Sequence, residues 1–292
     1  MKKNYKKEKK IKFSIICATV GSDRKLIQLC DSLNNQEYKN FELIVCDQNK
    51  NELNQKIKKI YKNTKIKFIK SKIGLSIARN KGILFSQGDY LVFLDDDIIL
   101  EKKYLKKINQ LLKTRKYDVV AYSVINKNNK PLLKYPKKNG YIKKLDQIFN
   151  CISSVSFVVK NNNKIYFDKN LGLGSKNVHQ SGEETDLLLR LVKKFKYKIF
   201  FTKDVKIIHN NKHLPIRNIL KKSFFYGCGW SYVVKKNNLN FNFILKNFVK
   251  IILNIIYHFL TLNLKKSLSS FSTLIGRIYG FKKKKKYNIL FY

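Results

Sequence analysis

Acidic residues are scarce in this chain. Its 292 residues include 19 Asp and Glu against 62 Lys and Arg, for a formal net charge of +43. Such an excess favours a polyanionic partner: nucleic acid, an anionic membrane face or a phosphorylated substrate. Arginine is also rare, because it occurs only at positions 24, 79, 115, 190, 217 and 277. Abundant Lys, Asn and Ile are also typical of proteins encoded by AT-rich genomes, in which lysines accumulate at solvated positions. Both interpretations of the charge therefore stay open.

Cysteine is too sparse and too scattered for a disulfide framework or a zinc site. The five cysteines are widely spaced and include no CxxC pair: Cys17, Cys30, Cys46, Cys151 and Cys228. We therefore expect a reduced, cytosolic protein. The sequence also lacks a zinc finger, an RNA-recognition aromatic signature and an arginine-clustered basic helix. A nucleic-acid-binding or other polyanion-binding protein remains the alternative class, and no specific nucleic acid is expected as a partner.

Short apolar, β-branched runs alternate with segments of helical periodicity in the first two thirds of the chain. Strands are predicted over 12–18, 41–46, 65–69 and 90–94, and helices over 25–34, 51–61 and 75–85. Repeated βα units predict an α/β fold with a mostly parallel sheet covered by helices. Ligands bind beyond the carboxyl ends of such strands. Thr19, Asp47 and the run Asp95–Asp97 follow three of the predicted strands there.

The later sequence is less regular. Strands are predicted over 150–160, 197–201 and 205–209, a glycine-rich loop over 171–175 and a helix over 183–195. Asp204 is the last acidic residue, and the composition changes near Pro215. We therefore predict a basic N-terminal tail (1–11), an α/β domain that carries the candidate site (12–214) and a helical, basic and apolar C-terminal extension (215–292).

The stretch GDYLVFLDDD (88–97) ends an apolar run in three aspartates. In an extended segment Asp95 and Asp97 point to one face while Asp96 points to the other. Two carboxylates on one face suit a hard divalent cation, which can bridge to a diphosphate. The alternative is a surface turn neutralised by nearby lysines.

A second acidic cluster lies in SGEETDLLLR (181–190). Glu183 and Glu184 open a predicted helix, where carboxylates gain from the helix dipole, so simple capping is one interpretation. With Asp186 and the preceding glycine-rich loop, the cluster also fits a catalytic base at the mouth of a cleft.

Five blocks in consistent order resemble the inverting family 2 glycosyltransferases, which have the GT-A fold. They are CATVGSDRKL (17–26), SLNNQEYKNFELIVCDQN (32–49), GLSIARNKGI (74–83), GDYLVFLDDD (88–97) and SGEETDLLLR (181–190). The resemblance covers residues 13–209 and implies transfer of a sugar from a nucleotide-diphospho-sugar, with a UDP-sugar favoured. It implies that six residues contact the nucleotide-sugar: Thr19, Asp47, Arg79, Asn80, Asp95 and Asp96.

The resemblance also implies metal ligands, a base and an acceptor site. A Mn²⁺ or Mg²⁺ ion would be held by Asp97, Asp95 and His209, with His213 a weaker candidate. The family base lies in an acidic pair that is usually Glu-Asp and is Glu-Glu here. Glu184 is the expected base, with Glu183 as its substitute. Asp186 and Trp230 are the acceptor candidates. Asp186 would orient either the helix or the acceptor, and Trp230 is also a natural core or interfacial anchor. A family member that binds a sugar nucleotide without turnover is a third possibility.

The C-terminal third is apolar and basic. Polar residues recur every four positions in 241–262, which predicts an amphipathic helix against a wide apolar face. A weaker apolar stretch (268–281) precedes five lysines at 282–286. This pattern suits the anionic inner face of the cell membrane. We expect a cytoplasmic, peripheral enzyme of cell-surface polysaccharide synthesis that uses a glycan or lipid-linked acceptor. The alternative is a helix packed on the catalytic domain.

Overall fold

The computed structural model describes residues 10–21, 23–49, 57, 61, 65–209 and 214–282. The chain divides into two compact units, each drawn from separate stretches of sequence. The first contains the described residues of 10–73, 77–166 and 191–209, and the second contains Gly74–Ser76, Phe167–Arg190 and the C-terminal helices. Most of the predicted tail, nearly all of the predicted helix over 51–61, His213 and the lysines after 282 lie outside the described residues.

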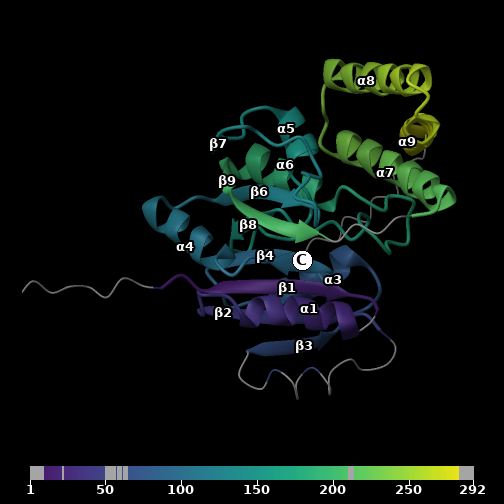
Figure 1. Cartoon of the computed structure of the whole chain (residues 1–292). Coiled ribbons are helices and arrows are strands. Elements are labelled where there is room, and N and C mark those ends of the chain that lie inside the picture. Colours follow the sequence, from purple (N-terminus) through teal and green to yellow (C-terminus); the bar gives the residue numbers. More distant parts are fainter. Residues whose placement is uncertain are drawn as a thin grey trace, which may run out of the picture. The chain divides into compact units, whose positions relative to one another are not determined.

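Within the described residues, a nine-stranded sheet organises the first unit (Figure 1). Its strand order is β3-β2-β1-β4-β8-β6-β9-β5, and β7 also pairs with β9. The strands are β1 (Phe13–Thr19), β2 (Phe41–Asp47), β3 (Ile66–Lys70), β4 (Tyr90–Asp95), β5 (Ile98–Leu100), β6 (Val119–Ile125), β7 (Gly140–Tyr141), β8 (Phe157–Lys160) and β9 (Ile199–His209).

The sheet is parallel in its N-terminal half and mixed beyond it. Strands β3, β2, β1 and β4 run parallel, as the repeated βα units predict. Strand β8 is antiparallel to both β4 and β6, and β5 and β7 are antiparallel to β9. The predicted α/β class is therefore correct, while the predicted mostly parallel arrangement holds only up to β4.

Helices bury their apolar stripes on this sheet. In α1 (Asp23–Asn34), Leu26, Leu29 and Leu33 are fully buried in the same core cluster as Ile15 and Val45. Each such side chain contributes about 1.5–3 kcal/mol by leaving water. The other helices are α3 (Leu75–Leu84), α4 (Tyr104–Thr114) and α5 (Leu145–Cys151). The packing of helices on the sheet and the pairing register of the strands together hold the strand ends in position.

Two sequence predictions of strand boundaries were wrong. The run predicted as a strand over 150–160 begins with the end of α5, and β8 starts only at Phe157. Between them the Ser153 backbone N–H donates to Ser156 Oγ, and both the backbone N–H and the hydroxyl of Ser156 donate to the Ser153 carbonyl. This tight turn occupies the backbone groups that a strand would need. The two strands predicted over 197–201 and 205–209 are one strand, β9, whose register against β6 shifts between Tyr122 and Ser123.

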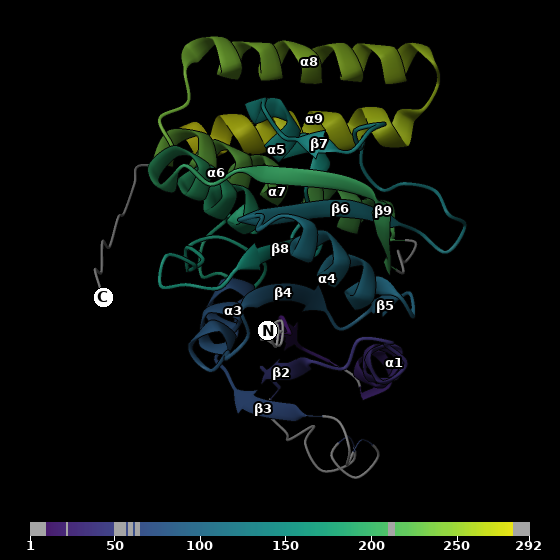
Figure 2. The same cartoon turned by 90° about the vertical axis from the view of Figure 1, so that its left-hand side faces the viewer.

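Helices make up most of the second unit. They are α6 (Glu183–Phe195), which begins here and ends in the first unit, α7 (Ile216–Lys236), α8 (Phe241–Leu260) and α9 (Leu264–Lys282). Helix α9 packs against both α7 and α8 (Figure 2). Glycines permit the α7–α9 approach, since a Cβ at Gly227 would collide with the Thr273 carbonyl and one at Gly276 with that of Phe224. Small residues allow such close helix packing.

Candidate active site

Three neighbouring parallel strands each end in a polar residue, and these residues lie along the same edge of the sheet. Thr19 at the end of β1 pairs in register with Asp47 at the end of β2. The preceding residue of β1, Ala18, pairs with Asp95 at the end of β4. These ends form the carboxyl edge of the parallel part of the sheet, where α/β proteins bind ligands.

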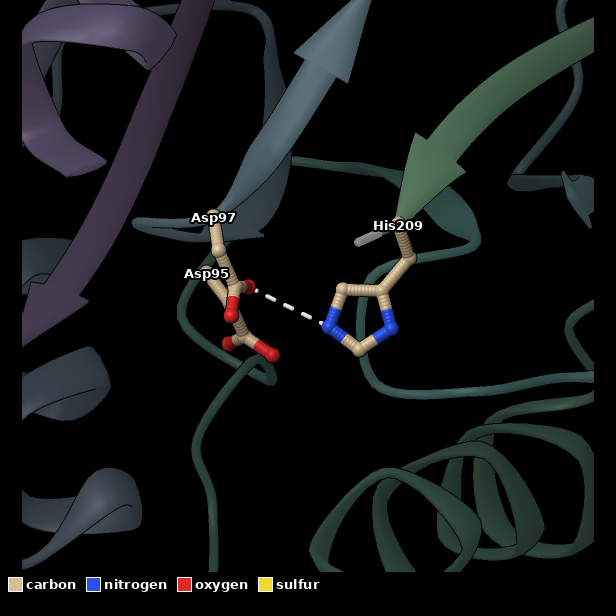
Figure 3. A group of neighbouring side chains, drawn as sticks. All are labelled: Asp95, Asp97 and His209. Carbon is tan, nitrogen blue, oxygen red and sulfur yellow. Dashed lines mark ion pairs between the residues drawn. The ribbon is translucent and has the colours of Figure 1, made fainter. Parts of the chain in front are cut away.

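The aspartate run forms the turn between β4 and β5. Asp95 is the last residue of β4, and Asp96 and Asp97 make the turn that precedes Ile98 of β5. Strand β5 pairs with β9 so that Ile98 lies opposite His209. Figure 3 shows Asp95, Asp97 and His209 pointing toward one another, and one ligand atom from each lies within 4.8 Å of the others. The two aspartates thus converge as predicted, but through chain reversal and not through alternation along a strand.

Arg79 of α3 holds Asp95 from within the protein. Its Nη2 lies 3.1 Å from Asp95 Oδ1, and the arginine side chain is fully buried. Its guanidinium carbon also lies 5.8 Å from the centre of the Phe93 ring. A buried arginine needs such partners because an unpaired buried charge is costly. Arg79 is thereby fixed beside the end of β4.

The other two aspartates share a lysine. Lys25 of α1 places Nζ 3.1 Å from Asp97 Oδ2 and 3.4 Å from Asp96 Oδ1. Thr19 donates a hydrogen bond of 2.6 Å to Asp96 Oδ2. His209 Nε2 lies 3.2 Å from Asp97 Oδ1. Both oxygens of Asp97 therefore face a basic group, each from a different element.

The environments of the two converging carboxylates shift their pKa values in opposite directions. Burial raises the pKa of Asp95, against the opposing charge of Arg79. Burial also acts to raise the pKa of Asp97, but hydrogen bonds and charge from His209 and Lys25 outweigh it and lower the value to about 2. Asp97 is therefore ionised at any physiological pH.

The donor set of this cluster fits a divalent cation. Two carboxylates supply the oxygen ligands that Mg²⁺ and Mn²⁺ prefer, and an imidazole nitrogen is a common third ligand for transition metals. Three protein ligands would leave coordination positions open for other oxygens. Such an ion would also favour the charged form of Asp95, whose pKa burial raises.

Asp47 shapes the loop that follows β2. Its side chain is buried, and its Oδ1 accepts hydrogen bonds from the backbone and side-chain nitrogens of Asn49, at 2.9 and 2.8 Å. Asn49 Oδ1 in turn accepts from the Gly21 backbone at 2.9 Å. The loops after β1 and β2 are thus tied together. Asn80 follows Arg79 on α3 and is partly buried.

In the second unit, the two glutamates open α6 as predicted. Glu183 is buried and Glu184 is partly exposed, directly after Gly182. Gly172 has a φ of +91°, and a Cβ there would lie 3.3 Å from the carboxylate carbon of Glu183. A glycine at 172 therefore lets the predicted glycine-rich loop close on Glu183 without strain.

Asp186 is part of an ionic network within the second unit. It is almost fully buried, and its oxygens face Lys236 Nζ at 2.8 Å and Asn237 Nδ2 at 3.0 Å. Lys236 Nζ also lies 2.6 Å from Asp168 Oδ2, which accepts a hydrogen bond from the Tyr232 hydroxyl at 3.0 Å. These bonds tie α6 to the end of α7. Of the two predicted roles of Asp186, they favour orientation of the helix.

Trp230 packs among aromatic residues of the three C-terminal helices. Its ring lies 6.4 Å from Phe243, 6.0 Å from Phe248 and 6.1 Å from Phe281, measured between centroids. The guanidinium of Arg277 lies 4.1 Å from the centre of the tryptophan ring. These contacts favour the core-anchor interpretation of Trp230 over direct contact with an acceptor.

Sequence reasoning missed Lys25 and Asn49 as neighbours of the site. Lys25 lies at the start of a predicted helix and inside the block 17–26, but as one of 62 basic residues nothing in the sequence distinguishes it. Asn49 lies inside a quoted block, but nothing in its local pattern distinguishes it from other loop asparagines. Register between β1, β2 and α1 brings them to the aspartates, and a single sequence does not reveal that register.

Comparisons with known proteins agree on one family. The sequence model described as glycosyl transferase family 2 matches residues 14–177, more than half of the chain. Poly(ribitol-phosphate) beta-N-acetylglucosaminyltransferase TarP of Staphylococcus aureus is 30% identical over 167 residues, which are 54% of this chain and 51% of TarP. Amylovoran biosynthesis glycosyltransferase AmsB of Erwinia amylovora is 36% identical over 96 residues, 30% of this chain and 32% of AmsB.

Solved structures agree on the fold. S. aureus TarS 1–349 in complex with UDP-GlcNAc has a TM-score of 0.59 and 15% identity, and the match covers 96% of this chain and 95% of that one. At this identity the likeness shows the fold alone, and it confirms the predicted GT-A fold class. The chain spans about half or less of the length of the two curated relatives.

Proposed function

Because the chain belongs to glycosyl transferase family 2, we propose that it is a metal-dependent, inverting glycosyltransferase. It would move a sugar from a nucleotide-diphospho-sugar to a hydroxyl of a glycan or lipid-linked acceptor, in cell-surface polysaccharide synthesis. One observation carries the proposal: Asp95, Asp97 and His209 converge within 4.8 Å at the carboxyl edge of the sheet. The names of TarP, a poly(ribitol-phosphate) N-acetylglucosaminyltransferase, and of AmsB, an amylovoran biosynthesis glycosyltransferase, support the cellular role.

Asp97, Asp95 and His209 would hold Mn²⁺ or Mg²⁺. When bound, the ion neutralises charge on the nucleoside diphosphate as it leaves. Asp97, with its lowered pKa, needs no deprotonation to bind a cation. The two carboxylates favour a hard cation, and His209 makes Mn²⁺ the better fit of the two.

The donor nucleotide would lie along the aligned strand ends. Thr19 and Asp47 end β1 and β2 in register and would lie near the ribose and base. Arg79, Asn80, Asp95 and Asp96 would line the diphosphate side. The UDP-GlcNAc bound in the TarS structure, which has the same fold, supports a UDP-sugar as the first donor to test.

Glu184 would act as the base, with Glu183 as its substitute. It accepts the proton of the acceptor hydroxyl while that oxygen attacks the anomeric carbon. The bond from that carbon to the diphosphate oxygen breaks on the opposite face, so the configuration inverts and the nucleoside diphosphate leaves. Asp186 would orient α6, which carries both glutamates, and Trp230 would support the acceptor side from within the helical core.

An anionic membrane would be the second partner. Helix α8 is long and apolar enough to span a membrane by length and composition, with a mean hydropathy of 1.5 over its best window. It also carries Lys246 and Lys250, and most of its apolar residues are exposed. We favour a peripheral position at the cytoplasmic face of the cell membrane, since an amphipathic, lysine-bearing helix suits the interface.

Calorimetric titration of UDP, with and without Mn²⁺, tests the proposal. Wild type should bind UDP in a Mn²⁺-dependent manner, and Asp97→Asn should weaken that binding by at least about tenfold, because a charged ligand is lost. The Asp204→Asn variant, which lies in the same unit and outside the cluster, is the control. If neither UDP, dTDP, GDP nor CDP binds with Mn²⁺, the transferase proposal fails and a polyanion-binding or inactive family member gains support.

A further inference from the structure

Lys25 pairs with Asp97, one of the proposed metal ligands. Its Nζ is 3.1 Å from Asp97 Oδ2, while His209 Nε2 is 3.2 Å from Asp97 Oδ1. Both oxygens of the proposed metal ligand are therefore engaged by basic groups of the protein itself. A metal ion that binds Asp97 through Oδ2 competes with the lysine for that oxygen, since two cations at contact distance from one oxygen repel each other.

The two cations of the cluster differ in mobility. Arg79 is fully buried and fixed beside Asp95. Lys25 retains 34% of its side-chain exposure. A lysine carries its charge on a flexible four-carbon stem, so Lys25 can swing toward solvent without disturbing α1. Arg79 is thus a permanent partner of the aspartates, and Lys25 is a replaceable one.

Charge balance then links the metal to the nucleotide. Without a ligand, Lys25 and Arg79 offset most of the charge of Asp95, Asp96 and Asp97. A divalent ion on its own would leave the cluster with excess positive charge and Lys25 without its partners. A diphosphate that arrives with the ion brings negative charge, which neutralises the excess and gives the displaced ammonium a new acceptor.

We propose that Lys25 is a displaceable internal counter-ion that pairs with Asp97 and competes with a divalent cation for this carboxylate until the cation arrives together with the nucleotide diphosphate. The inference rests on the proposed function of the Asp95–Asp97–His209 cluster. It makes metal and nucleotide binding mutually reinforcing, and by thermodynamic linkage the reinforcement must be equal in both directions. Asp96 and Thr19 complete the resting position, because Asp96 accepts from both Thr19 and Lys25.

Electron paramagnetic resonance of free Mn²⁺ measures this directly, without any turnover. Mn²⁺ is titrated into the full chain with and without UDP, for wild type, Lys25→Met and Lys25→Arg. We expect Lys25→Met to bind Mn²⁺ alone about tenfold more tightly than wild type, since a competing charge is gone. The tightening of Mn²⁺ binding by UDP should shrink by a similar factor. Lys25→Arg, which keeps the charge, should resemble wild type.

Arg24→Met is the matched control, because it removes one positive charge from the same helix at an exposed position. Unchanged or weaker Mn²⁺ binding by Lys25→Met, with a normal melting temperature, overturns the proposal and makes Lys25 a permanent structural partner of Asp97. An equal gain in Arg24→Met also overturns it, because the effect would then come from net charge. Failure of every variant to bind Mn²⁺ even with UDP overturns the metal site itself and is thus distinguishable.

Discussion

Glu183 and Glu184 are adjacent on α6 but differ in environment. Glu183 is buried against Gly172, whereas Glu184 keeps part of its surface exposed. A base must reach the acceptor hydroxyl, so the more accessible carboxylate suits that task, and the buried one suits support of the helix start. We therefore expect the two residues to differ in what their loss does to kcat.

Glu184→Gln should lower kcat by at least about a hundredfold, as expected when a general base is removed. Mn²⁺-dependent UDP binding should stay at the wild-type level, because this residue would contact the acceptor and not the nucleotide. The isosteric Glu183→Gln variant is the comparison and should retain more activity. Steady-state kinetics with a transferred UDP-sugar and calorimetry on the same samples give both values. A larger loss in Glu183→Gln would move the base assignment to that residue.

At the residue scale, the sequence predicts the candidate metal ligands better than it predicts the residues that contact them. Asp95 and Asp97 could be placed together from their spacing at the end of an apolar run, whereas His209 was expected beside them only from the family resemblance. Lys25 could not be found, because its contact with Asp97 depends on how α1 sits on β1. The metal, nucleotide and base roles of these residues stay predictions until binding and kinetics are measured.

The ionic network between α6 and α7 joins two elements that are far apart in sequence. Lys236 on α7 pairs with Asp186 on α6 and with Asp168 in the loop before it. Burial acts to raise the pKa of Asp168, but the charge and hydrogen bond of Lys236 outweigh it and the pKa is lowered. A carboxyl whose pKa is lower in the folded state than in the unfolded state stabilises the fold when it is ionised.

This network predicts a pH dependence of stability. The contribution of Asp168 is fully present above its ordinary value of 3.8 and is lost as the pH falls from there through the lowered folded-state pKa. Asp168→Asn should therefore melt at a lower temperature than wild type at pH 7, and the difference should narrow below about pH 4. Thermal melts followed by circular dichroism across pH 7 to 3 measure this. A difference that stays constant with pH would exclude an ionic role for Asp168.

Elements with simple periodicity were predicted well, and those fixed by tertiary contacts were not. The helices over 25–34 and 183–195 follow their apolar spacing almost to the residue. Strand β5 has only three residues, and it exists because it pairs with β9 opposite His209. Helix α7 runs through two glycines that sequence reasoning left without a structural role, because close packing on α9 requires one of them, Gly227.

At the scale of the whole molecule, the fold class could be predicted from the sequence, but the grouping of chain segments into two compact units could not. Repeated βα units are a local pattern, so the α/β class was available from the sequence. The second unit combines Gly74–Ser76 and Phe167–Arg190 with the C-terminal helices, and no composition change marks the first two segments. The domain boundary between 214 and 215 stays a prediction. The proposal that the large positive charge serves to bind an anionic partner also stays a prediction. Membrane binding offers the most direct test of that charge.

The exposed face of α8 should bind anionic membranes. Leu253 and Ile256 are 59% and 49% exposed, and the helix also carries Lys246 and Lys250. Wild type should co-sediment with phosphatidylcholine vesicles that contain phosphatidylglycerol, and added salt should weaken binding, since each lysine near the surface contributes about 1 kcal/mol. Replacing Leu253 and Ile256 together with Glu should reduce the bound fraction at least about fivefold, because apolar burial and charge attraction are both lost.

Leu84→Glu is the control, since Leu84 is 82% exposed on α3 of the first unit and the substitution adds one of the two negative charges that the α8 double variant adds. It should bind vesicles almost as wild type does, because one added charge barely changes the total of +43. If this variant and the α8 double variant lose binding equally, the attraction is a property of overall charge and α8 has no special part in it. If neither loses binding, the membrane contact lies elsewhere on the chain. Loss of binding confined to the α8 variant would instead show that the membrane contact is local to α8.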